Sequence, residues 1–238
     1  MTPTSQLTLA VQLPDDETFT SFQLGDNQAC VLQLKNFIEK VAGVEEPLSF
    51  YLFGNHGVGK SHLLHAACSY ADSMNQTNFC MSFSQLTELS IEVLEGLEHF
   101  DLVCLDDIQL IAGNKVWQQA VFDLFNRVIE QGNKIIITGN DSVKELAITL
   151  PDLVSRLAWG ETQSIKQLSD SDKVLALQFR ANQRGMQLSV EVAKFLINRQ
   201  ARDMASLISS LDKLDKASIR EQRKITIPFI KEVLFNLD

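Results

Sequence analysis

The fold is decided by the stretch Gly54-Asn55-His56-Gly57-Val58-Gly59-Lys60-Ser61, which matches the pattern G-x-x-x-x-G-K-S without a mismatch. An apolar run at 49–53 precedes it and is typical of a buried strand, and apolar residues recur at helical spacing over 62–71 after it. Strand, glycine loop and helix are the context in which this pattern binds phosphate. Backbone N–H groups of the loop and the positive end of the following helix then face the phosphates.

The last residues of this loop predict separate roles in binding a nucleotide. Lys60 is expected to reach the β- and γ-phosphates, and the Ser61 hydroxyl is expected to ligate Mg²⁺. His62, which follows directly, is included in the predicted nucleotide-binding set 54–62. The alternative is a glycine turn that matches the pattern without a ligand.

Composition describes a soluble globular chain of 238 residues, with 45% hydrophobic and 21% charged residues. The net charge of −9 argues against a protein that binds DNA over its whole surface, although it leaves room for a local basic patch. The sequence has neither an apolar run of membrane-spanning length nor a secretory signal, which favours a cytoplasmic protein without membrane contact.

Cysteine and histidine residues do not predict a metal site. The four cysteines are expected to be buried thiols, because they form no C-x-x-C pair and lie in predicted helices or strands: Cys30, Cys68, Cys80 and Cys104. His62 and His65 are three residues apart on a predicted helix, but no further ligand follows them at metal-binding spacing.

The order of predicted elements indicates an α/β fold, with a parallel sheet flanked by helices and a small all-α domain behind it. We expect a tail at 1–17, an α/β nucleotide-binding domain at 18–163 and a helical lid domain at 164–238. The α/β elements are expected at 27–42, 49–53, 60–72, 78–83, 102–105, 115–131 and 134–138, with an amphipathic stretch at 84–96. After Gly160 only helices are expected, at about 169–185, 189–199 and 203–220 and from 226 onward.

Polar residues at the ends of two predicted strands are candidates for catalytic roles. Asp106 and Asp107 follow an apolar strand, where Asp106 would contact Mg²⁺ and Asp107 would contact the attacking water. Asn140 follows the next strand, where its amide could orient that water or touch the γ-phosphate. The alternatives are strand-ending carboxylates that only keep the chain soluble and a Gly-Asn turn.

Arg156 stands at the end of the predicted α/β domain, in Leu150-Pro151-Asp152-Leu153-Val154-Ser155-Arg156-Leu157. A planar, permanently charged guanidinium suits a phosphoryl group in transfer, whether it is supplied to its own nucleotide or to that of a neighbour. A surface arginine without this role is the alternative.

These motifs together resemble the AAA+ core of the bacterial replication initiator DnaA over residues from about 18 to the end of the chain. The resemblance lies in the phosphate loop with its helix, in Asp106-Asp107-Ile108-Gln109 and in Ser155-Arg156-Leu157-Ala158-Trp159-Gly160. DnaA continues into a DNA-binding domain, whereas this sequence stops at Asp238, directly after the expected lid. That combination is similar to the Hda branch of the family, the regulatory inactivators of DnaA.

The resemblance extends to the tail. Gln6, Leu7, Leu9 and Val11 match the peptide by which partners bind the sliding clamp of DNA polymerase (its beta subunit), although physics alone would favour a frayed end. The resemblance implies ADP or another nucleotide as ligand, contact with DnaA, and contact with DNA only through the clamp, which would bring the protein to the nucleoid. It also allows a homodimer or larger oligomer. Arg156 is then an arginine finger that acts on the ATP of DnaA.

One residue departs from the family pattern. Lids of this family place a sensor arginine directly after the [VM] residue of an R-x-x-[VM]-R segment. Here Ala205 follows Met204 in Arg202-Asp203-Met204-Ala205, so alanine stands at the arginine position. Loss of that charge predicts weak intrinsic ATP hydrolysis at most and favours ADP as the resident ligand. Arg202 is close enough in the sequence to take the place of the missing arginine, but this expectation does not rely on it.

Three functions remain open on the sequence. The chain could be a regulator that stimulates the ATPase of DnaA, a self-sufficient ATPase that loads or remodels replication proteins, or an adaptor that recruits DnaA without stimulating hydrolysis.

Overall fold

The computed structural model of the protein describes residues 17–39, 47–86, 88–200 and 203–235. Its α/β part is built on five strands whose order is β2-β3-β4-β1-β5, and every neighbouring pair is parallel. The strands are β1 (Ser49–Phe53), β2 (Asn78–Ser82), β3 (Leu102–Asp106), β4 (Lys134–Gly139) and β5 (Glu161–Ser164). This parallel sheet between helices confirms the predicted α/β class.

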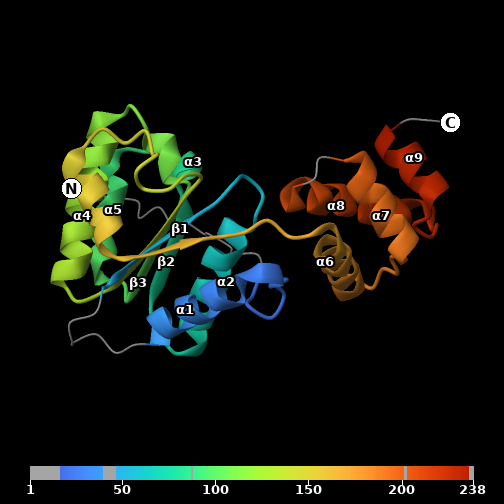
Figure 1. Cartoon of the computed structure of the whole chain (residues 1–238), viewed down its shortest axis with the longest axis horizontal. Coiled ribbons are helices and arrows are strands. Elements are labelled where there is room, and N and C mark those ends of the chain that lie inside the picture. Colours follow the sequence, from blue (N-terminus) through green and yellow to red (C-terminus); the bar gives the residue numbers. More distant parts are fainter. Residues whose placement is uncertain (1–16, 40–46, 87, 201–202, 236–238) are drawn as a thin grey trace, which may run out of the picture.

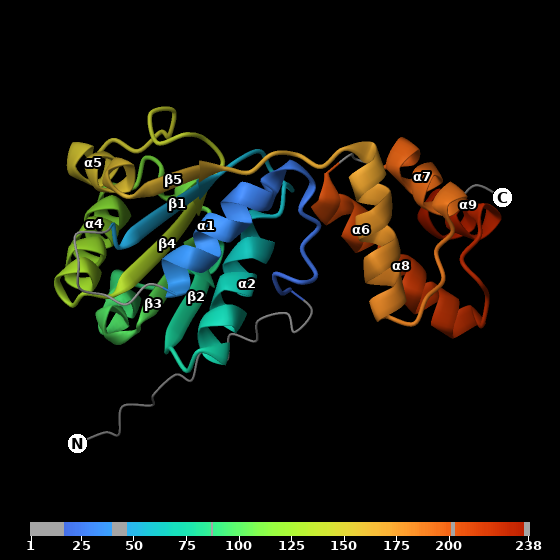
Figure 2. The ribbon, with the colours of Figure 1, turned by 60° about the horizontal axis from the view of Figure 1, so that its bottom comes forward.

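Helices cover both faces of the sheet (Figure 2). On one face, α1 (Gln28–Glu39) and α2 (Lys60–Ser73) pack against residues such as Phe50 and Leu52 of β1. On the other face, Tyr51 packs with α3 (Phe83–Leu86), α4 (Lys115–Glu130) and α5 (Pro151–Trp159). Alternate residues of a strand point to opposite faces, so a strand covered on both faces is apolar throughout, and the run 49–53 could be recognised for that reason.

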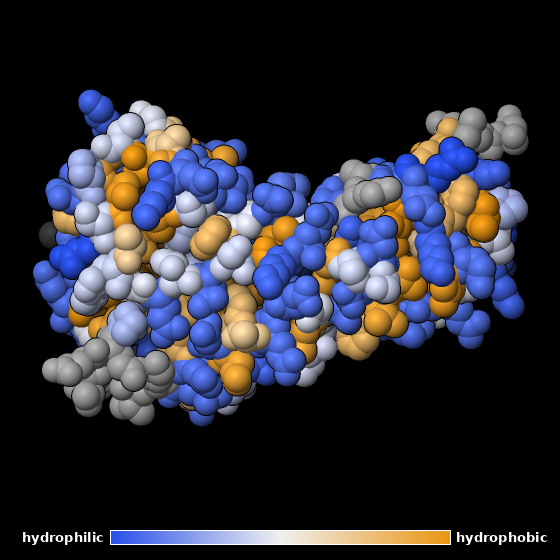
Figure 3. All heavy atoms as spheres, viewed as in Figure 1, coloured by the Kyte–Doolittle hydropathy of each residue, from blue (hydrophilic) through white to orange (hydrophobic). Residues whose placement is uncertain are grey.

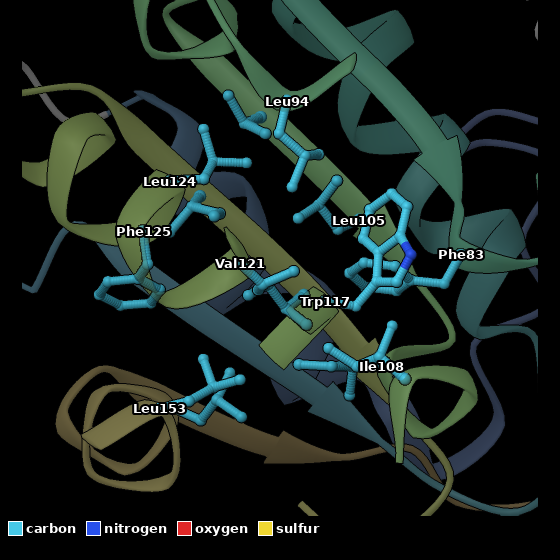
Figure 4. Packing of buried hydrophobic residues seen from close by; sticks show 14 of the residues in the cluster. Phe83, Leu94, Leu105, Ile108, Trp117, Val121, Leu124, Phe125 and Leu153 are labelled. Carbon is cyan, nitrogen blue, oxygen red and sulfur yellow. The ribbon is translucent and has the colours of Figure 1, made fainter. Parts of the chain in front are cut away.

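Helix α4 is the centre of the second face. Its apolar side Trp117, Val121, Leu124 and Phe125 lies against β3, against the 3-10 helix η4 (Ile108–Ile111) and against Leu153 of α5 (Figure 4). Short 3-10 helices η2 (Ile91–Leu94) and η3 (Leu97–His99) cover its far end, and a third, η1 (Gly25–Asn27), precedes α1.

The lid domain consists of helices with a hydrophobic core of their own: α6 (Asp170–Gln183), α7 (Val190–Arg199), α8 (Met204–Glu221) and α9 (Ile227–Phe235). It lies at one end of the molecule, and α4 and α5 lie at the other (Figure 1). Three of its helices have a side-chain cap at the N-terminus, as their sequences indicate. Each cap accepts a hydrogen bond from the backbone N–H of the residue three positions later, and the caps are Ser169, Ser189 and Asp203. The exact domain boundaries at residues 17/18 and 163/164 stay a prediction.

Two details of the secondary structure differ from expectation. The segment after Gly160 is not helices only, because Glu161–Ser164 first forms the edge strand β5 beside β1. This strand was missed because its side chains are polar and its central strand neighbour supplies the pairing. The stretch 84–96 is divided between α3 and η2, and Gly96 ends it with a φ of 83°.

The four cysteines are buried free thiols, as expected: Cys30, Cys68, Cys80 and Cys104. Among the described residues, no helix has both the length and the apolar character that a membrane crossing requires. On the face seen in Figure 3, hydrophobic side chains are interspersed among hydrophilic ones over both domains.

Candidate nucleotide-binding site

The order of the strands brings the predicted site residues together. Because β4 lies between β1 and β3 and all three are parallel, their carboxyl ends meet at the same edge of the sheet. The loop 54–59 follows β1, Asp106 ends β3, and Asn140 follows β4. Ligands of open α/β sheets bind at this edge.

The phosphate loop needs glycine at two positions for both conformation and space. Gly57 and Gly59 have backbone φ values of 75° and 102°, which residues other than glycine rarely adopt. A methyl group at Gly57 would lie 2.6 Å from Cβ of Asp203, and one at Gly59 would lie 2.8 Å from the Phe22 ring. The loop is therefore enclosed by the lid on one side and by the segment before α1 on the other.

Lys60 is buried at the first position of α2, and its ammonium group contacts three oxygen atoms. It donates to the carbonyl oxygens of Gly54 and Asn55, at 2.8 and 3.2 Å, and to Oδ1 of Asn140 at 2.9 Å. Burial lowers the pKa of Lys60, while the carboxylates of Asp107, Asp106 and Asp141 oppose that shift. The charge that the sequence assigns to the phosphates thus stands at the centre of the loop, linked to Asn140.

Asp106 is buried beside Ser61, the other predicted magnesium ligand. Its carboxylate accepts hydrogen bonds from the hydroxyls of Thr138 and Ser61. Burial raises the pKa of Asp106, and the neighbouring charge of Asp107 adds to this, against the effect of the two hydroxyls. A hydroxyl in contact with a carboxylate, at the end of a phosphate loop, fits Mg²⁺, which prefers few protein ligands and completes its shell with phosphate and water.

Asp107 lies in an unusual backbone conformation for a residue other than glycine, with φ 65° and ψ 51°. Its N–H donates to Oγ1 of Thr138 at 3.0 Å, and its Oδ1 accepts from Nε2 of Gln109 at 2.8 Å. Oε1 of Gln109 accepts the N–H of Asn140 at 3.2 Å. Gln109, which the sequence analysis named only as part of the family motif, therefore links the two groups predicted to act on water.

A cavity of ≈ 200 Å³ lies over the phosphate loop, between the α/β domain and the lid. It is lined from three directions, by the loop and α2, by the segment before α1, and by the lid. The lining residues are Glu17, Ser21, Phe22, Gln23, His56, Gly57, Val58, Gly59, Lys60, Ser61, His62, Asp107, Leu168, Ala176, Arg180, Met204, Ala205 and Ile208. Its mixture of polar loop atoms and apolar lid residues suits a nucleotide, with phosphates at one end and a base at the other.

The lid contacts the phosphate loop directly. The N–H of Met204 donates to the carbonyl of Gly57 at 3.2 Å. Nη2 of Arg180, on α6, lies 3.1 Å from Nδ1 of His62 and 3.9 Å from Oε1 of Glu17. Among the described residues that line the cavity, Arg180 is the arginine that the lid supplies; Ala205 also lines it, and Arg202 lies outside the described residues. Sequence reasoning missed Arg180 and Glu17, because no local pattern connects positions so far apart in the chain.

Helix α2 is also tied to the segment before α1 by a charged hydrogen bond. Nδ1 of His65 lies 2.6 Å from Oε2 of Glu17. Burial by itself would lower the pKa of His65, but hydrogen bonds with Cys80 and Glu17 raise it to about 10. The pKa of Glu17 is lowered, since the hydrogen bond with His65 and nearby positive charges outweigh the opposing effect of burial.

Arg156 lies apart from the other predicted site residues. It is in the last turn of α5, half-buried, with its guanidinium 5.9 Å from the ring centre of the exposed Trp159. It is not among the residues that line the cavity, and α5 lies at the end of the molecule remote from the lid (Figures 1 and 2). The predicted partner-binding residues Gln6, Leu7, Leu9 and Val11 lie outside the described residues.

Within the described ranges, no group of three or more His, Cys, Asp or Glu side chains is arranged to hold a metal ion. Ser61 and Asp106 stay the predicted ligands of a magnesium ion that a bound nucleotide would bring.

Comparison with known proteins supplies the family. The model of the bacterial DnaA ATPase domain matches residues 13–164, which is more than half of the chain. The chain belongs to the bacterial DnaA ATPase-domain family. A second model, described as the lid domain of Hda, matches residues 170–234. The phosphate loop described above thus belongs to a DnaA-like AAA+ protein.

Solved structures share the fold. Domain III of the replication initiation protein DnaA of Thermotoga maritima has a TM-score of 0.82 at 19% identity, covering 94% of this chain and 98% of that one. AMPPCP-bound DnaA from Aquifex aeolicus has a TM-score of 0.69 at 21% identity and covers 89% of this chain and 71% of that one. The Thermotoga maritima RuvB branch-migration motor follows, at 0.64 and 15% identity, covering 88% of this chain and 69% of that one.

The His65–Glu17 pair predicts how stability depends on pH. The unfolded imidazole loses its proton near its ordinary pKa of 6.5, while the folded one keeps it up to about 10. The contribution of the pair is therefore full below the unfolded pKa and is lost as pH rises through the folded pKa. Glu17→Gln should lower the free energy of unfolding by about 1.5–3 kcal/mol at about pH 6.5, and the deficit should shrink toward about pH 10.

Denaturant unfolding of both proteins across this range measures the difference. The matched control is Glu98→Gln, which removes another ion pair, between Glu98 and Arg127, that contains no group titrating in this range. Its deficit should stay constant between about pH 8 and pH 10, where that of Glu17→Gln shrinks. A Glu17→Gln deficit that is equally constant would contradict a charged His65.

Proposed function

We propose that this DnaA-family protein is a negative regulator of replication initiation. It holds ADP with Mg²⁺ in the cavity over the phosphate loop, is tethered to the sliding clamp by the tail residues Gln6 to Val11, and stimulates the hydrolysis of ATP bound to DnaA. The stretch 170–234, which matches the lid of Hda, supports a place in that branch of the family. DNA contact through the clamp, association with the nucleoid and a homodimeric or larger assembly belong to the same proposal.

The position of Arg156 is the observation that carries this proposal. The protein's own cavity lies between the α/β domain and the lid, whereas Arg156 lies on α5 at the other end of the molecule. A guanidinium placed there cannot serve the nucleotide of its own chain. It can serve a nucleotide on a second molecule whose phosphate loop faces α5, which in this family would be DnaA-ATP.

Two lid residues favour ADP over ATP in the protein's own site. Ala205 lines the cavity at the position where the family pattern has an arginine, so that position supplies no charge to a γ-phosphate. Asp203 places its Oδ1 2.8 Å from the point where a Cβ of Gly57 would stand, and hydrogen bonds with Ser206 hold the pKa of Asp203 low in spite of burial. A carboxylate beside the loop repels an additional phosphate charge.

Each residue of the site has a defined part in holding the nucleotide. The loop N–H groups and Lys60 bind phosphate oxygens, and Ser61 with Asp106 would hold the magnesium ion. That ion would neutralise phosphate charge when bound. Asp107 and Asn140, which both bond to Gln109, would orient the attacking water.

The same arrangement is the specific support for a second candidate, a self-sufficient ATPase that loads or remodels replication proteins. Lys60, Asp106, Asp107 and Asn140 are assembled within one hydrogen-bonded site. A third candidate, an adaptor that recruits DnaA without stimulating hydrolysis, is distinguished by the Arg156 variants described below.

Nucleotide preference gives the first test. Titration calorimetry should show tighter binding of ADP than of ATP, and the isolated protein should turn ATP over slowly. Lys60→Ala should abolish binding of both, because the buried ammonium meets the phosphate charge inside the loop. Tighter ATP binding with fast turnover would favour the self-sufficient ATPase instead.

The Arg156 variants give the second test. Arg156→Ala should lose most of the stimulated hydrolysis of DnaA-ATP, since an arginine finger contributes about 10³–10⁵ in rate in related systems. Arg156→Lys should also largely fail, because a point charge does not reproduce the planar guanidinium. Both variants should keep ADP affinity and the thermal midpoint of unfolding.

Arg199→Ala is the matched control for Arg156. Arg199 is an exposed arginine near the end of a helix, 5.8 Å from the ring centre of Phe195, so its surroundings are similar, but it lies on the lid. The Arg199→Ala variant should stimulate the hydrolysis of DnaA-ATP as much as the unchanged protein does. Full stimulation by Arg156→Ala would exclude the proposed action on DnaA and leave the recruiting adaptor.

The tail gives the third test. Replacing Leu7 and Leu9 with alanine should abolish retention on immobilised clamp, because each leucine anchor in an apolar groove contributes on the order of 1.5–3 kcal/mol. Calorimetry with ADP and thermal unfolding should be unchanged. Thr2→Ala with Thr4→Ala, outside the matched peptide, is the control and should be retained. Co-elution of the leucine double variant with clamp would show that the peptide is not the tether.

A further inference from the structure

Gln118 is a fully buried polar side chain that bonds in two directions from α4. Its Nε2 donates to the carbonyl of Ile111, at 3.1 Å, at the end of η4. Its Oε1 accepts from the N–H groups of Thr149 and Leu150, both at 3.0 Å, and from the Thr149 hydroxyl at 3.2 Å. Buried amides are retained where such bonds fix the position of neighbouring segments.

The first segment that Gln118 holds belongs to the protein's own nucleotide site. Helix η4 begins directly after Asp107, and its residue Gln109 bonds to both Asp107 and Asn140. Asn140 in turn accepts a hydrogen bond from Lys60. A continuous series of hydrogen bonds and one short helix therefore connects the phosphate loop with Gln118.

The second segment that Gln118 holds is the start of α5, the helix that carries Arg156. Leu150 is the N-cap residue of α5 and has no side-chain cap, and Pro151 follows it. Gln118 accepts the N–H of this N-cap residue, as a glutamate or glutamine at the third helical position does in a capping box. The N-terminal position of α5 is thus set by a residue of α4 that also bonds to the nucleotide site.

Apolar packing alone would not fix this arrangement. Trp117 and Val121 of α4 contact the apolar side chains of η4 and α5 in the core (Figure 4). Such contacts are non-directional, so small displacements cost little, whereas hydrogen bonds of a buried amide constrain both distance and direction. Gln118 makes such directional bonds to the end of η4 and to the start of α5 at the same time.

We propose that Gln118 is a positioning residue that couples the occupant of the nucleotide site to α5 and so sets the orientation of Arg156. The role of Arg156 on DnaA-ATP rests on the proposed function; the coupling to α5 does not, and it can be measured without DnaA.

Gln118→Glu separates the two directions of bonding. An ionised carboxylate accepts only, so it keeps the bonds from Thr149 and Leu150 and loses the bond to Ile111. A protonated carboxyl donates again and restores that bond. The groups that contact the Gln118 amide are backbone groups and the Thr149 hydroxyl, none of which titrates between about pH 6 and pH 8, so a burial-raised pKa makes the loss reversible with pH.

Trp159 reports on α5 directly. The chain has two tryptophans, so in a Trp117→Phe background the fluorescence comes from Trp159, three residues after Arg156 on the same helix. ADP addition should change Trp159 emission at both pH values. With Gln118→Glu added, the change in Trp159 emission should disappear at about pH 8 and return at about pH 6. Calorimetry should show that the affinity of this variant for ADP stays within about twofold of that of the background protein at the same pH.

The control is Gln119→Glu. Gln119 is the adjacent, exposed glutamine, and its side-chain amide donates a hydrogen bond to Asp123 on the same helix. This substitution should leave the Trp159 response intact at both pH values. If the Gln118→Glu protein fails to fold at the higher pH, Gln118→Met, of similar length and without charge, should lose the response at both. An undiminished Trp159 response in the Gln118 variants, or no response in the background protein, would overturn the coupling.

Stimulation of DnaA-ATP hydrolysis is the second readout. Gln118→Glu should stimulate at least about tenfold less than the unchanged protein at about pH 8 and should approach it at about pH 6. If the unchanged protein does not stimulate DnaA, the proposed function fails while the fluorescence result still decides the coupling. If the unchanged protein stimulates the hydrolysis of DnaA-ATP and Gln118→Glu stimulates it equally at both pH values, the role of Gln118 in orienting Arg156 is excluded.

Discussion

The hydrogen bonds of the buried Lys60 ammonium organise the site, because they join the ends of two strands. Lys60 donates to two carbonyls of the loop after β1 and to Asn140 after β4. A buried ammonium without such partners is costly, so the loop conformation and the position of Asn140 are fixed together. A phosphate group that enters the loop offers the same ammonium stronger acceptors. A bound phosphate would therefore compete with the three present acceptors of Lys60, among them Asn140, which also bonds to Gln109.

The lid completes the site with contacts of a different kind. Met204 bonds to the backbone of the loop, and Arg180 bonds to His62 of α2. Neither contact depends on a large apolar interface, since the lid has its own core. A nucleotide in the cavity would thus lie between two units that each have their own hydrophobic core, which suits a ligand that must enter and leave. Glu17 belongs to the same set of contacts, which connects the segment before α1 with both α2 and the lid.

The sequence was sufficient for every feature that a local pattern specifies. The strand 49–53, the phosphate loop and the capped lid helices were placed correctly because spacing, glycine and capping residues act within a few positions. What escaped prediction depends on contacts between distant positions. The edge strand β5 has a polar sequence and forms because β1 pairs with it. Arg180 and His62 are 118 residues apart, and Gln118 looks like any helical glutamine until the folded chain surrounds it.

Because the cavity and Arg156 are far apart, a nucleotide in the cavity can influence Arg156 only through a structural connection between them. If one molecule holds a nucleotide between its two domains and acts on a partner at the end that carries α5, the resident nucleotide has no influence on that action unless the two places are structurally coupled. Between them lie the sheet edge, η4 and α4, whose apolar contacts permit small displacements. A directional contact is needed where η4 meets the start of α5, and the buried amide of Gln118 occupies that place. An apolar residue of the same size would preserve the packing there but would leave the N–H groups of Thr149 and Leu150 without acceptors. The polar side chain is therefore best understood as a constraint on the orientation of α5.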